Sequence, residues 1–189
     1  MQRNSLLRSV APKILLVSWL TLALPLHGQS NAQLDTLNGH LLGNWKGVNH
    51  DYTNTPTITS KVSIVIVRDN KPNQLKMYYT YVENPTKKTT HYVFLIRFDP
   101  KKSTLFRDRG KEGGKETYDV EGLDEVLRTG YGDFKLKGIG MDSHRKKKPY
   151  RADYHLTAQT FSYEVYLGGD DTPVVRTGDL SLSRENPNP

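Results

Sequence analysis

The stretch TITSKVSIVIVRDNKPNQLKMYYTYVENPTKKTTHYVFLIRF, residues 57–98, decides the fold class of this chain. It contains three runs rich in β-branched and aromatic residues, at Thr57–Arg68, Leu75–Val82 and His91–Phe98. Polar clusters with Asn, Lys and Pro separate the runs, and such clusters are typical of turns. This arrangement predicts successive antiparallel strands that are joined as hairpins.

The same pattern continues toward the carboxyl end of the chain. Further strands are expected at Tyr131–Ile139, Tyr150–Leu156, Phe161–Leu167 and Val174–Leu182. Many strands with almost no helix favour an antiparallel sandwich or barrel. A meander of hairpins without a long crossover closes most simply as a barrel, because closure removes the exposed sheet edges. We therefore expect an all-β fold, a single antiparallel up-and-down β-barrel of about 8–10 strands.

Three segments are not expected to be strands. Leucines recur with helical spacing over Gln33–Leu42, which predicts a short N-terminal helical turn before a strand that begins at Trp45. Gly43 is a suitable C-cap for that turn. The glycine-rich segment Arg109–Lys115 is expected to be a flexible loop, and Gly122–Arg128 is either a helical turn or a loop.

The inward-facing side chains of such a barrel predict a cavity wall. A barrel of this size holds its own side chains and one small ligand, and alternate residues of each strand face the interior. Tyrosine offers an apolar ring and a hydroxyl, although it is also common in cross-strand packing. The expected ligand is therefore a small apolar or amphipathic molecule. The predicted wall residues are Ile64, Ile66, Met77, Tyr79, Tyr81, Phe94, Ile96, Phe161, Tyr163 and Val165.

Residues 1–32 have the three parts of a cleaved secretory signal peptide. A basic start precedes the apolar run Ile14–Leu24, and small and polar residues lead to Ala32. The run is shorter than the ~20 residues of a membrane-spanning helix, so an uncleaved anchor is the less favoured alternative. Cleavage after Ala32 would leave residues 33–189 as one periplasmic or secreted barrel domain, without stable membrane insertion.

Composition limits the kinds of site that the chain can hold. The sequence has no cysteine, which excludes a disulfide framework, a thiolate metal site and a lipid-bearing cysteine. Its 27 Lys and Arg exceed its 20 Asp and Glu, and the run His144–Arg151 holds much of the excess. This run lacks the interleaved aromatic residues of nucleic-acid readers, so a solvated turn is favoured and no nucleic-acid partner is expected.

The segment Leu41-Leu42-Gly43-Asn44-Trp45-Lys46-Gly47 resembles the G-x-W motif of lipocalins and related lipocalin-like barrels. The resemblance implies a helical turn that plugs one end of the barrel and a tryptophan that starts the first strand. It also implies a basic residue of the last strand stacked across the tryptophan ring, which a cation–π interaction would stabilise. The matching residue is Arg184, so Trp45 and Arg184 are the expected barrel-closing pair.

The same opening is also similar to nitrobindin-type barrels, which hold haem through a histidine near the carboxyl end. The expected last strand contains no histidine, and His155 lies too early in the chain to take that place. The haem site therefore does not carry over, and no cofactor is expected. The histidines also lack the spacing of known metal motifs, so no metal site is expected.

Arg151, Asp153 and His155 alternate along one strand and form the candidate polar group. If they faced the interior, they would present a cation, a carboxylate and an imidazole to a ligand. The favoured interpretation places them in solvent, because Tyr154 and Leu156 of the opposite parity suit the core better.

Three hypotheses on function follow. The favoured one is an exported barrel, not an enzyme, that binds a small apolar or amphipathic molecule in its interior. The second is a hydrolase or isomerase that uses the interior group Arg151, Asp153 and His155. The third is an envelope interaction domain that binds an anionic partner through residues 144–151. The sequence predicts no particular oligomeric state.

Overall fold

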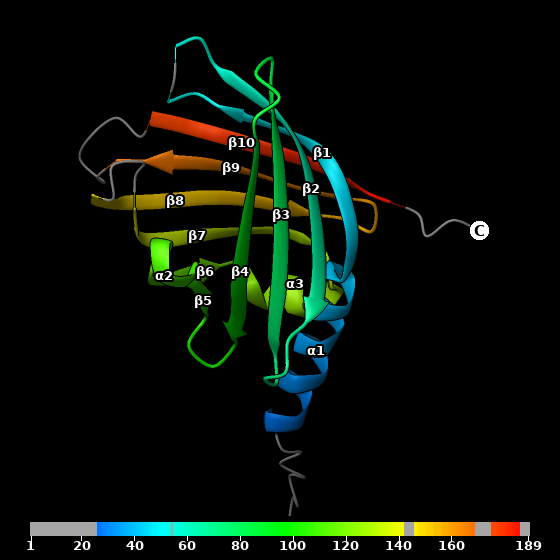
Figure 1. Cartoon of the computed structure of the whole chain (residues 1–189). Helices are drawn as coiled ribbons and strands as arrows, with labels where there is room; N and C mark the ends of the chain where they lie inside the picture. Colours follow the sequence, from blue (N-terminus) through cyan, green and yellow to red (C-terminus); the bar gives the residue numbers. More distant parts are fainter. Residues whose placement is uncertain (1–25, 54, 142–145, 169–174, 186–189) are drawn as a thin grey trace, which may run out of the picture.

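The computed structural model describes residues 26–53, 55–141, 146–168 and 175–185. Ten antiparallel strands follow one another in chain order around a closed barrel, and the first pairs with the last (Figure 1). The predicted up-and-down barrel is therefore confirmed. The strands are β1 (Gly43–Asp51), β2 (Ile58–Arg68), β3 (Gln74–Asn84), β4 (Thr89–Asp99), β5 (Thr104–Asp108), β6 (Lys115–Glu121), β7 (Gly132–Met141), β8 (Lys147–Leu156), β9 (Thr160–Leu167) and β10 (Val175–Arg184).

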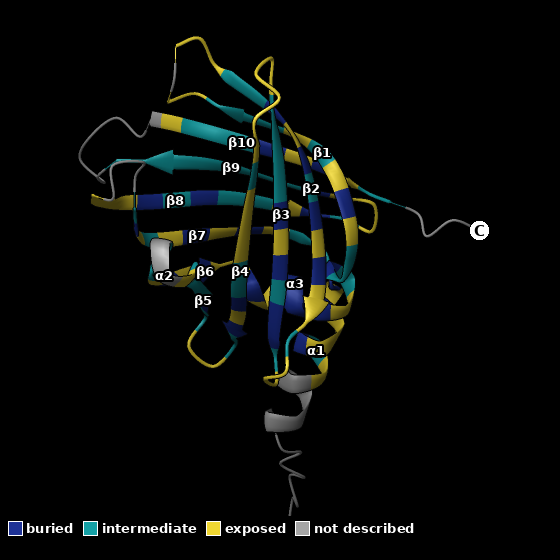
Figure 2. Cartoon of the chain, viewed as in Figure 1, coloured by how far each residue is buried: buried dark blue, intermediate teal, exposed yellow. Residues whose placement is uncertain are grey.

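The interior of the barrel is the hydrophobic core. Successive side chains of a strand point to opposite faces, so each strand contributes alternate residues to the inside. In β2, Val62, Ile64 and Ile66 are buried, whereas the intervening Val65 and Val67 are exposed on the outside. The same alternation colours the strands in bands of dark blue and yellow in Figure 2.

Two helices close one end of the barrel, which we call the floor. Helix α1 (Leu26–Leu41) leads directly into β1, and Leu34, Leu37 and Leu41 on one face of it are almost fully buried. Helix α3 (Leu123–Thr129) connects β6 to β7 and lies against α1 (Figure 1). The packing of these leucines excludes water from the floor, so any ligand must enter from the opposite end.

The contact between α1 and α3 depends on a glycine. His40 at the end of α1 stacks on Tyr131 with ring centroids 4.1 Å apart, and its Nδ1 donates a hydrogen bond to the Gly130 carbonyl oxygen at 3.0 Å. Gly130 ends α3 in the left-handed conformation, with φ of 79°. A Cβ at this position would lie 2.3 Å from the His40 ring. Both the conformation and the close approach therefore require glycine.

The other end of the barrel, which we call the mouth, is where β1, β3, β5, β7 and β9 end. The one-turn helix α2 (Gly110–Gly113) connects β5 to β6 at the mouth. The sequence predicted only a loop over Arg109–Lys115 and missed both flanking strands, which are short and interrupted by charged residues. The helical alternative for Gly122–Arg128 is confirmed by α3, and α1 is longer than the turn predicted over Gln33–Leu42.

Trp45 and Arg184 lie where the first and last strands meet. The register of β1 and β10 pairs the two residues, and the Arg184 guanidinium lies 4.4 Å from the Trp45 ring centroid. This is the stacking that the lipocalin resemblance implies. Trp45 is fully buried, and its indole Nε1 donates a hydrogen bond to the Leu41 carbonyl oxygen at 3.0 Å.

The Arg184 guanidinium also satisfies three backbone carbonyls. It donates hydrogen bonds to the oxygens of His40 and Leu42, which flank the end of α1, and to the oxygen of Ala158 in the turn between β8 and β9. The last carbonyls of a helix have no partner within the helix, so these bonds join the end of α1 to the last strand and, through Arg184, to the turn between β8 and β9 at the floor.

The predicted signal peptide falls largely on residues 1–25, which lie outside the described residues. Among the residues that the structure describes, no helix combines the length and the apolar character that a bilayer crossing requires. Ala32 is exposed, and the described buried face of α1 begins at Leu34. Cleavage after Ala32 would therefore remove no side chain that is described as buried.

Replacing the barrel-closing arginine should destabilise the fold. Arg184→Leu removes the cation–π contact with Trp45 and leaves three carbonyls unpaired, which should lower the free energy of unfolding by about 2–4 kcal/mol. Urea unfolding followed by Trp fluorescence measures this change. Arg128→Leu is the matched control, because Arg128 is exposed on α3 and, among the described residues, pairs with Glu125 alone. Equal unfolding midpoints for the two variants would show that Arg184 does not close the barrel.

Candidate ligand-binding site

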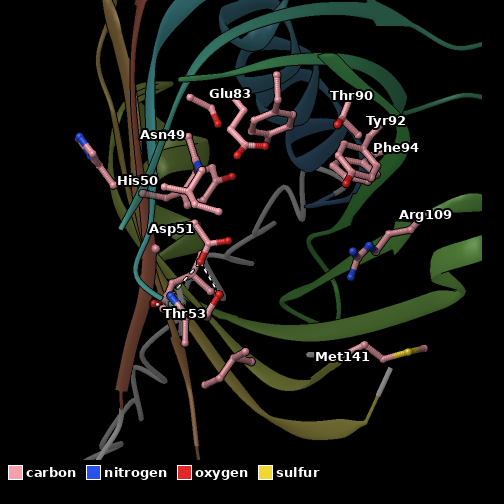
Figure 3. A pocket seen from close by; sticks show the side chains of 18 of the residues that line it. Asn49, His50, Asp51, Thr53, Glu83, Thr90, Tyr92, Phe94, Arg109 and Met141 are labelled. Carbon is pink, nitrogen blue, oxygen red and sulfur yellow. Dashed lines mark hydrogen bonds between the residues drawn. The ribbon is translucent and has the colours of Figure 1, made fainter. Parts of the chain in front are cut away.

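A cavity of about 440 Å³ opens at the mouth of the barrel, and we call it the cup. It lies within the range of about 300–1,000 Å³ that is typical of small-molecule sites. Figure 3 shows the cup from close by, with Asp51 and Glu83 on one side and Arg109 reaching in from the other. Its lining residues are Asn49, His50, Asp51, Thr53, Ile58, Ser60, Tyr81, Glu83, Lys88, Thr90, Tyr92, Phe94, Arg109, Met141, Tyr163, Val165, Leu167, Thr177 and Gly178.

A second, smaller cavity of about 60 Å³ lies deeper in the barrel. Phe94 and Tyr163 line both cavities, so these two side chains separate the cup from the deep cavity. Leu41 of α1 contributes to the wall of the deep cavity at the floor. A space of this size holds about two water molecules at liquid density, so within the barrel interior the cup is the part that can take a ligand.

Aromatic rings of β3 and β4 form one wall of the cup. Tyr81 packs edge-to-face on Tyr92 with centroids 5.8 Å apart, and Tyr92 stacks on Phe94 at 6.0 Å. Tyr79 lies 4.9 Å from Phe94 at the base of the wall. Tyr92 is 43% exposed although it faces the inside of the barrel, because the cup is open above it. Its ring is therefore an uncovered apolar surface at the mouth.

An ion pair is buried between β5 and β6. Arg107 Nε donates a hydrogen bond to Glu116 Oε2 at 2.8 Å, and Arg107 Nη2 donates one to the Tyr118 hydroxyl. The Glu116 side chain is only 4% exposed. The Arg107 guanidinium also lies over the Tyr118 and Tyr150 rings, at 4.9 Å and 5.4 Å from their centroids. Its hydrogen bonds and both rings hold Arg107 in one position.

Arg109 is the second cation on this side of the cup. Its Nη1 lies 3.7 Å from Glu116 Oε1, which is longer than a hydrogen bond. The guanidinium lies 5.9 Å from the Phe94 ring centroid, and the Arg109 side chain is 30% exposed. Within the described ranges of the chain, this guanidinium makes no hydrogen bond. Arg109 therefore has donors available to a molecule in the cup.

The charge states in the barrel interior are fixed at neutral pH. Burial raises the pKa of the Tyr79, Tyr154 and Tyr163 hydroxyls well above the ordinary value, so these groups stay neutral. Burial alone would lower the pKa of Arg107, but the surrounding tyrosines and Glu116 outweigh it and raise that pKa, so Arg107 stays charged.

Eight of the ten predicted wall residues line the two cavities. Tyr81 and Val165 line the cup, Met77, Tyr79, Ile96 and Phe161 line the deep cavity, and Phe94 and Tyr163 line both. Ile64 and Ile66 also face inward, but they contact neither cavity. They belong to the packed core, where Ile64 is the β2 neighbour of Trp45, so the prediction that they line a cavity is wrong.

The candidate polar group lies outside the barrel. Tyr150, Ala152 and Leu156 of β8 are buried, and Arg151, Asp153 and His155 have the opposite parity. The alternative that places these three residues in the interior is therefore wrong, and the favoured outward arrangement is the one observed.

Each member of this group has a partner on the outer surface. Arg151 Nη2 donates to Asp153 Oδ2 at 2.9 Å and its guanidinium covers the Tyr166 ring, while His155 Nδ1 lies 2.5 Å from Asp133 Oδ1. Since no member reaches the cup, this group cannot act on a ligand there.

The basic run His144–Arg151 is only partly described, because residues 142–145 lie outside the described residues. Lys146, Lys147 and Lys148 are exposed at the mouth, where β8 begins. In the described ranges, no three His, Cys, Asp or Glu side chains are grouped as metal ligands would be.

Sequence reasoning missed Arg107, Arg109 and Glu116, because it predicted no strand in this part of the chain. A weak signal was present. Leu105 and Arg107 share one parity, and Glu116, Tyr118 and Val120 share another across a glycine-rich turn. That pattern is typical of a hairpin with a charged pair on its inner face.

No protein-family model and no curated protein sequence matches the chain. Among solved structures, it is similar to the S-type phycobiliprotein lyase CPES of Guillardia theta, with 8% identity, a TM-score of 0.56, and 86% of this chain and 98% of that chain covered. Other similar structures are Rv2717c of M. tuberculosis (17% identity, TM-score 0.48, coverage 82% and 98%) and EF1p2_mFAP2b bound to DFHBI (11%, 0.37, 84% and 98%). The likeness to the lyase shows a shared β-barrel fold.

The buried tyrosines should make the protein unstable in alkali. Above about pH 10 the tyrosines of the unfolded chain lose their protons, whereas Tyr79, Tyr154 and Tyr163 keep theirs in the folded chain. The unfolded state then binds fewer protons, so the free energy of unfolding should fall by about 1.4 kcal/mol per pH unit for each of them. Urea unfolding at a series of pH values measures the slope. Tyr163→Phe should reduce it by one tyrosine, and a slope of zero would contradict the prediction.

Proposed function

We propose that this chain is an exported barrel that binds one small amphipathic molecule in the cup. The single observation that carries the proposal is the open cavity of about 440 Å³ at the mouth of a barrel whose floor is closed. An apolar aromatic wall and a few polar groups, one of them the available Arg109 guanidinium, are the features that ligand sites share. Binding rather than catalysis is proposed because the candidate acid–base group lies outside the barrel.

The energetics of the cup also support a ligand. An aromatic side chain exposes about 150–250 Å² of surface. Removing that surface from water is favourable by about 4–6 kcal/mol, at roughly 25 cal/mol per Å². Tyr92 remains 43% exposed inside the cup, so part of that free energy is available to an incoming apolar group. The rigid strands β3 and β4 hold the wall in place before binding, which lowers the entropy cost of association.

A bulky side chain placed in the cup should weaken ligand binding. Thr90 of β4 lines the cup, so Thr90→Trp places an indole in it, whereas Thr89→Trp places the same indole on the exposed outer face of the same strand. With the neutral fluorescent probe dansylamide, we expect micromolar binding to the native protein and to Thr89→Trp. Thr90→Trp should weaken that binding about tenfold or more.

Two outcomes would overturn the proposal of a cup ligand. One is the absence of dansylamide binding, and the other is equal binding to the two tryptophan variants. Native mass spectrometry before and after organic extraction adds a test without a chosen probe. A discrete mass that extraction removes from the native protein, and that Thr90→Trp lacks, is the expected result.

Export is the second part of the proposal and rests on the sequence of residues 1–32. In a bacterial host, the protein outside the cytoplasm should have an intact mass that begins at Gln33. Leu16→Arg, which interrupts the apolar run, should leave the full-length chain in the cytoplasm. A full-length chain outside the cytoplasm would contradict cleavage after Ala32, and a full-length native chain that stays in the cytoplasm would contradict export.

A further inference from the structure

We infer that the ligand of the cup is an aromatic acid held in one orientation, with its acidic group on Arg109 and its ring system on the Tyr81–Tyr92–Phe94 wall. This inference rests on the proposed function, since it names the class of molecule that the cup selects. Two observations support it: the positions of the charged side chains around the cup, and the difference, within the described residues, between Arg107, which is hydrogen-bonded, and Arg109, which is not.

Arg109 is the cation of the cup that lies beside the Phe94 end of the aromatic wall, whereas the lining residue Lys88 lies next to Glu83. Arg107 is bound by Glu116 and Tyr118 and lies below the cup, among the lining residues of the deep cavity. Arg109 lines the cup itself, and its contact with Glu116 Oε1 at 3.7 Å leaves the guanidinium without a hydrogen bond in the described part of the chain. A carboxylate or sulfonate in the cup can accept two parallel N–H bonds from such a group.

Glu116 cannot neutralise both arginines. Its Oε2 is engaged by Arg107, and its Oε1 is buried without a hydrogen bond. Two guanidinium groups therefore share one carboxylate on this side of the barrel, and the neighbouring tyrosines are neutral at physiological pH. The Arg109 side of the cup therefore has an uncompensated positive charge, which an acidic group of the ligand would balance.

The opposite side of the cup carries two carboxylates and one cation, Lys88, whose carbonyl oxygen accepts a hydrogen bond from the Glu83 N–H. Asp51 ends β1 and Glu83 lies near the end of β3, and Figure 3 shows both across the cup from Arg109. The Glu83 carboxylate has no hydrogen bond or ion pair among the residues that the structure describes. The two carboxylates outnumber Lys88 on this side, so an anionic group is favoured on the Arg109 side, and the two sides together favour one orientation of the ligand.

The position of the aromatic wall fits this orientation. The Phe94 ring is the end of the wall and lies 5.9 Å from the Arg109 guanidinium, while Tyr92 and Tyr81 continue it toward the Glu83 side. A ring system placed on Tyr92 therefore brings a substituent at its end within reach of Arg109. A flexible aliphatic acid would gain less from these faces, because ring pairs add stacking energy to area burial.

The test uses two probes that share one ring system and differ in charge. Dansylglycine carries a carboxylate, and dansylamide is neutral. Arg109→Met should weaken dansylglycine binding about tenfold or more and change dansylamide binding less than about twofold, because it removes charge-assisted hydrogen bonds and keeps the apolar stem. Glu83→Gln should strengthen dansylglycine binding by a few fold, since it removes a repulsive charge.

Lys115→Met is the matched control. Lys115 precedes Glu116 in β6, so its substitution by Met also removes one positive charge at the mouth of the barrel. The Lys115 side chain, however, lies on the outer face and is 72% exposed. We expect it to leave both affinities unchanged, and near-ultraviolet circular dichroism verifies that every variant is folded. Equal effects of Arg109→Met on both probes, or no effect on either, would overturn the inference while the proposed function stands. Failure of both probes to bind the native protein would overturn both.

Discussion

The contact between the Arg184 guanidinium and Trp45 is the interaction on which the rest of the barrel depends. It joins the last strand to the first and also satisfies carbonyls at the end of α1 and in the turn between β8 and β9. The two strands approach so closely there that a Cβ at Gly47 would lie 1.8 Å from the Ser181 carbonyl oxygen. Closure therefore constrains a cation, an indole and a glycine at once, which few sequences satisfy by chance.

Closing the floor in this way decides where a ligand can be held. The leucines of α1 fill the lower barrel, so the interior space lies toward the mouth, where the single turn α2 is the only helix of the described residues. The desolvation penalty of a buried ion pair is offset only when its groups are hydrogen-bonded. Arg107 meets that condition through its hydrogen bonds to Glu116 and Tyr118. The partly paired Arg109 is the exception, and exceptions of this kind mark functional sites.

Sequence periodicity predicted the barrel and most of its cavity wall. Alternating apolar residues in β3, β4 and β9 have only one face that suits a core, so their inward direction follows from the pattern. The pattern could not separate Ile64, which packs on the floor, from Tyr81, which lines the cup, because both are inward residues. Depth along the barrel depends on strand register and on the position of α1, which a local pattern does not contain.

The sequence by itself determined the closed antiparallel barrel and the direction of its apolar side chains, because alternation and turn chemistry are local properties. The pairing of Trp45 with Arg184 was expected only from the resemblance to lipocalins. Only the tertiary structure decided which charged residues face the cup. Arg109 and Glu83 are 26 residues apart in sequence and lie on opposite sides of one cavity. Arg151, Asp153 and His155 lie outside although their residue types suit a site. A charged side chain gives no periodic signal, so its direction is set by the apolar neighbours that must be buried.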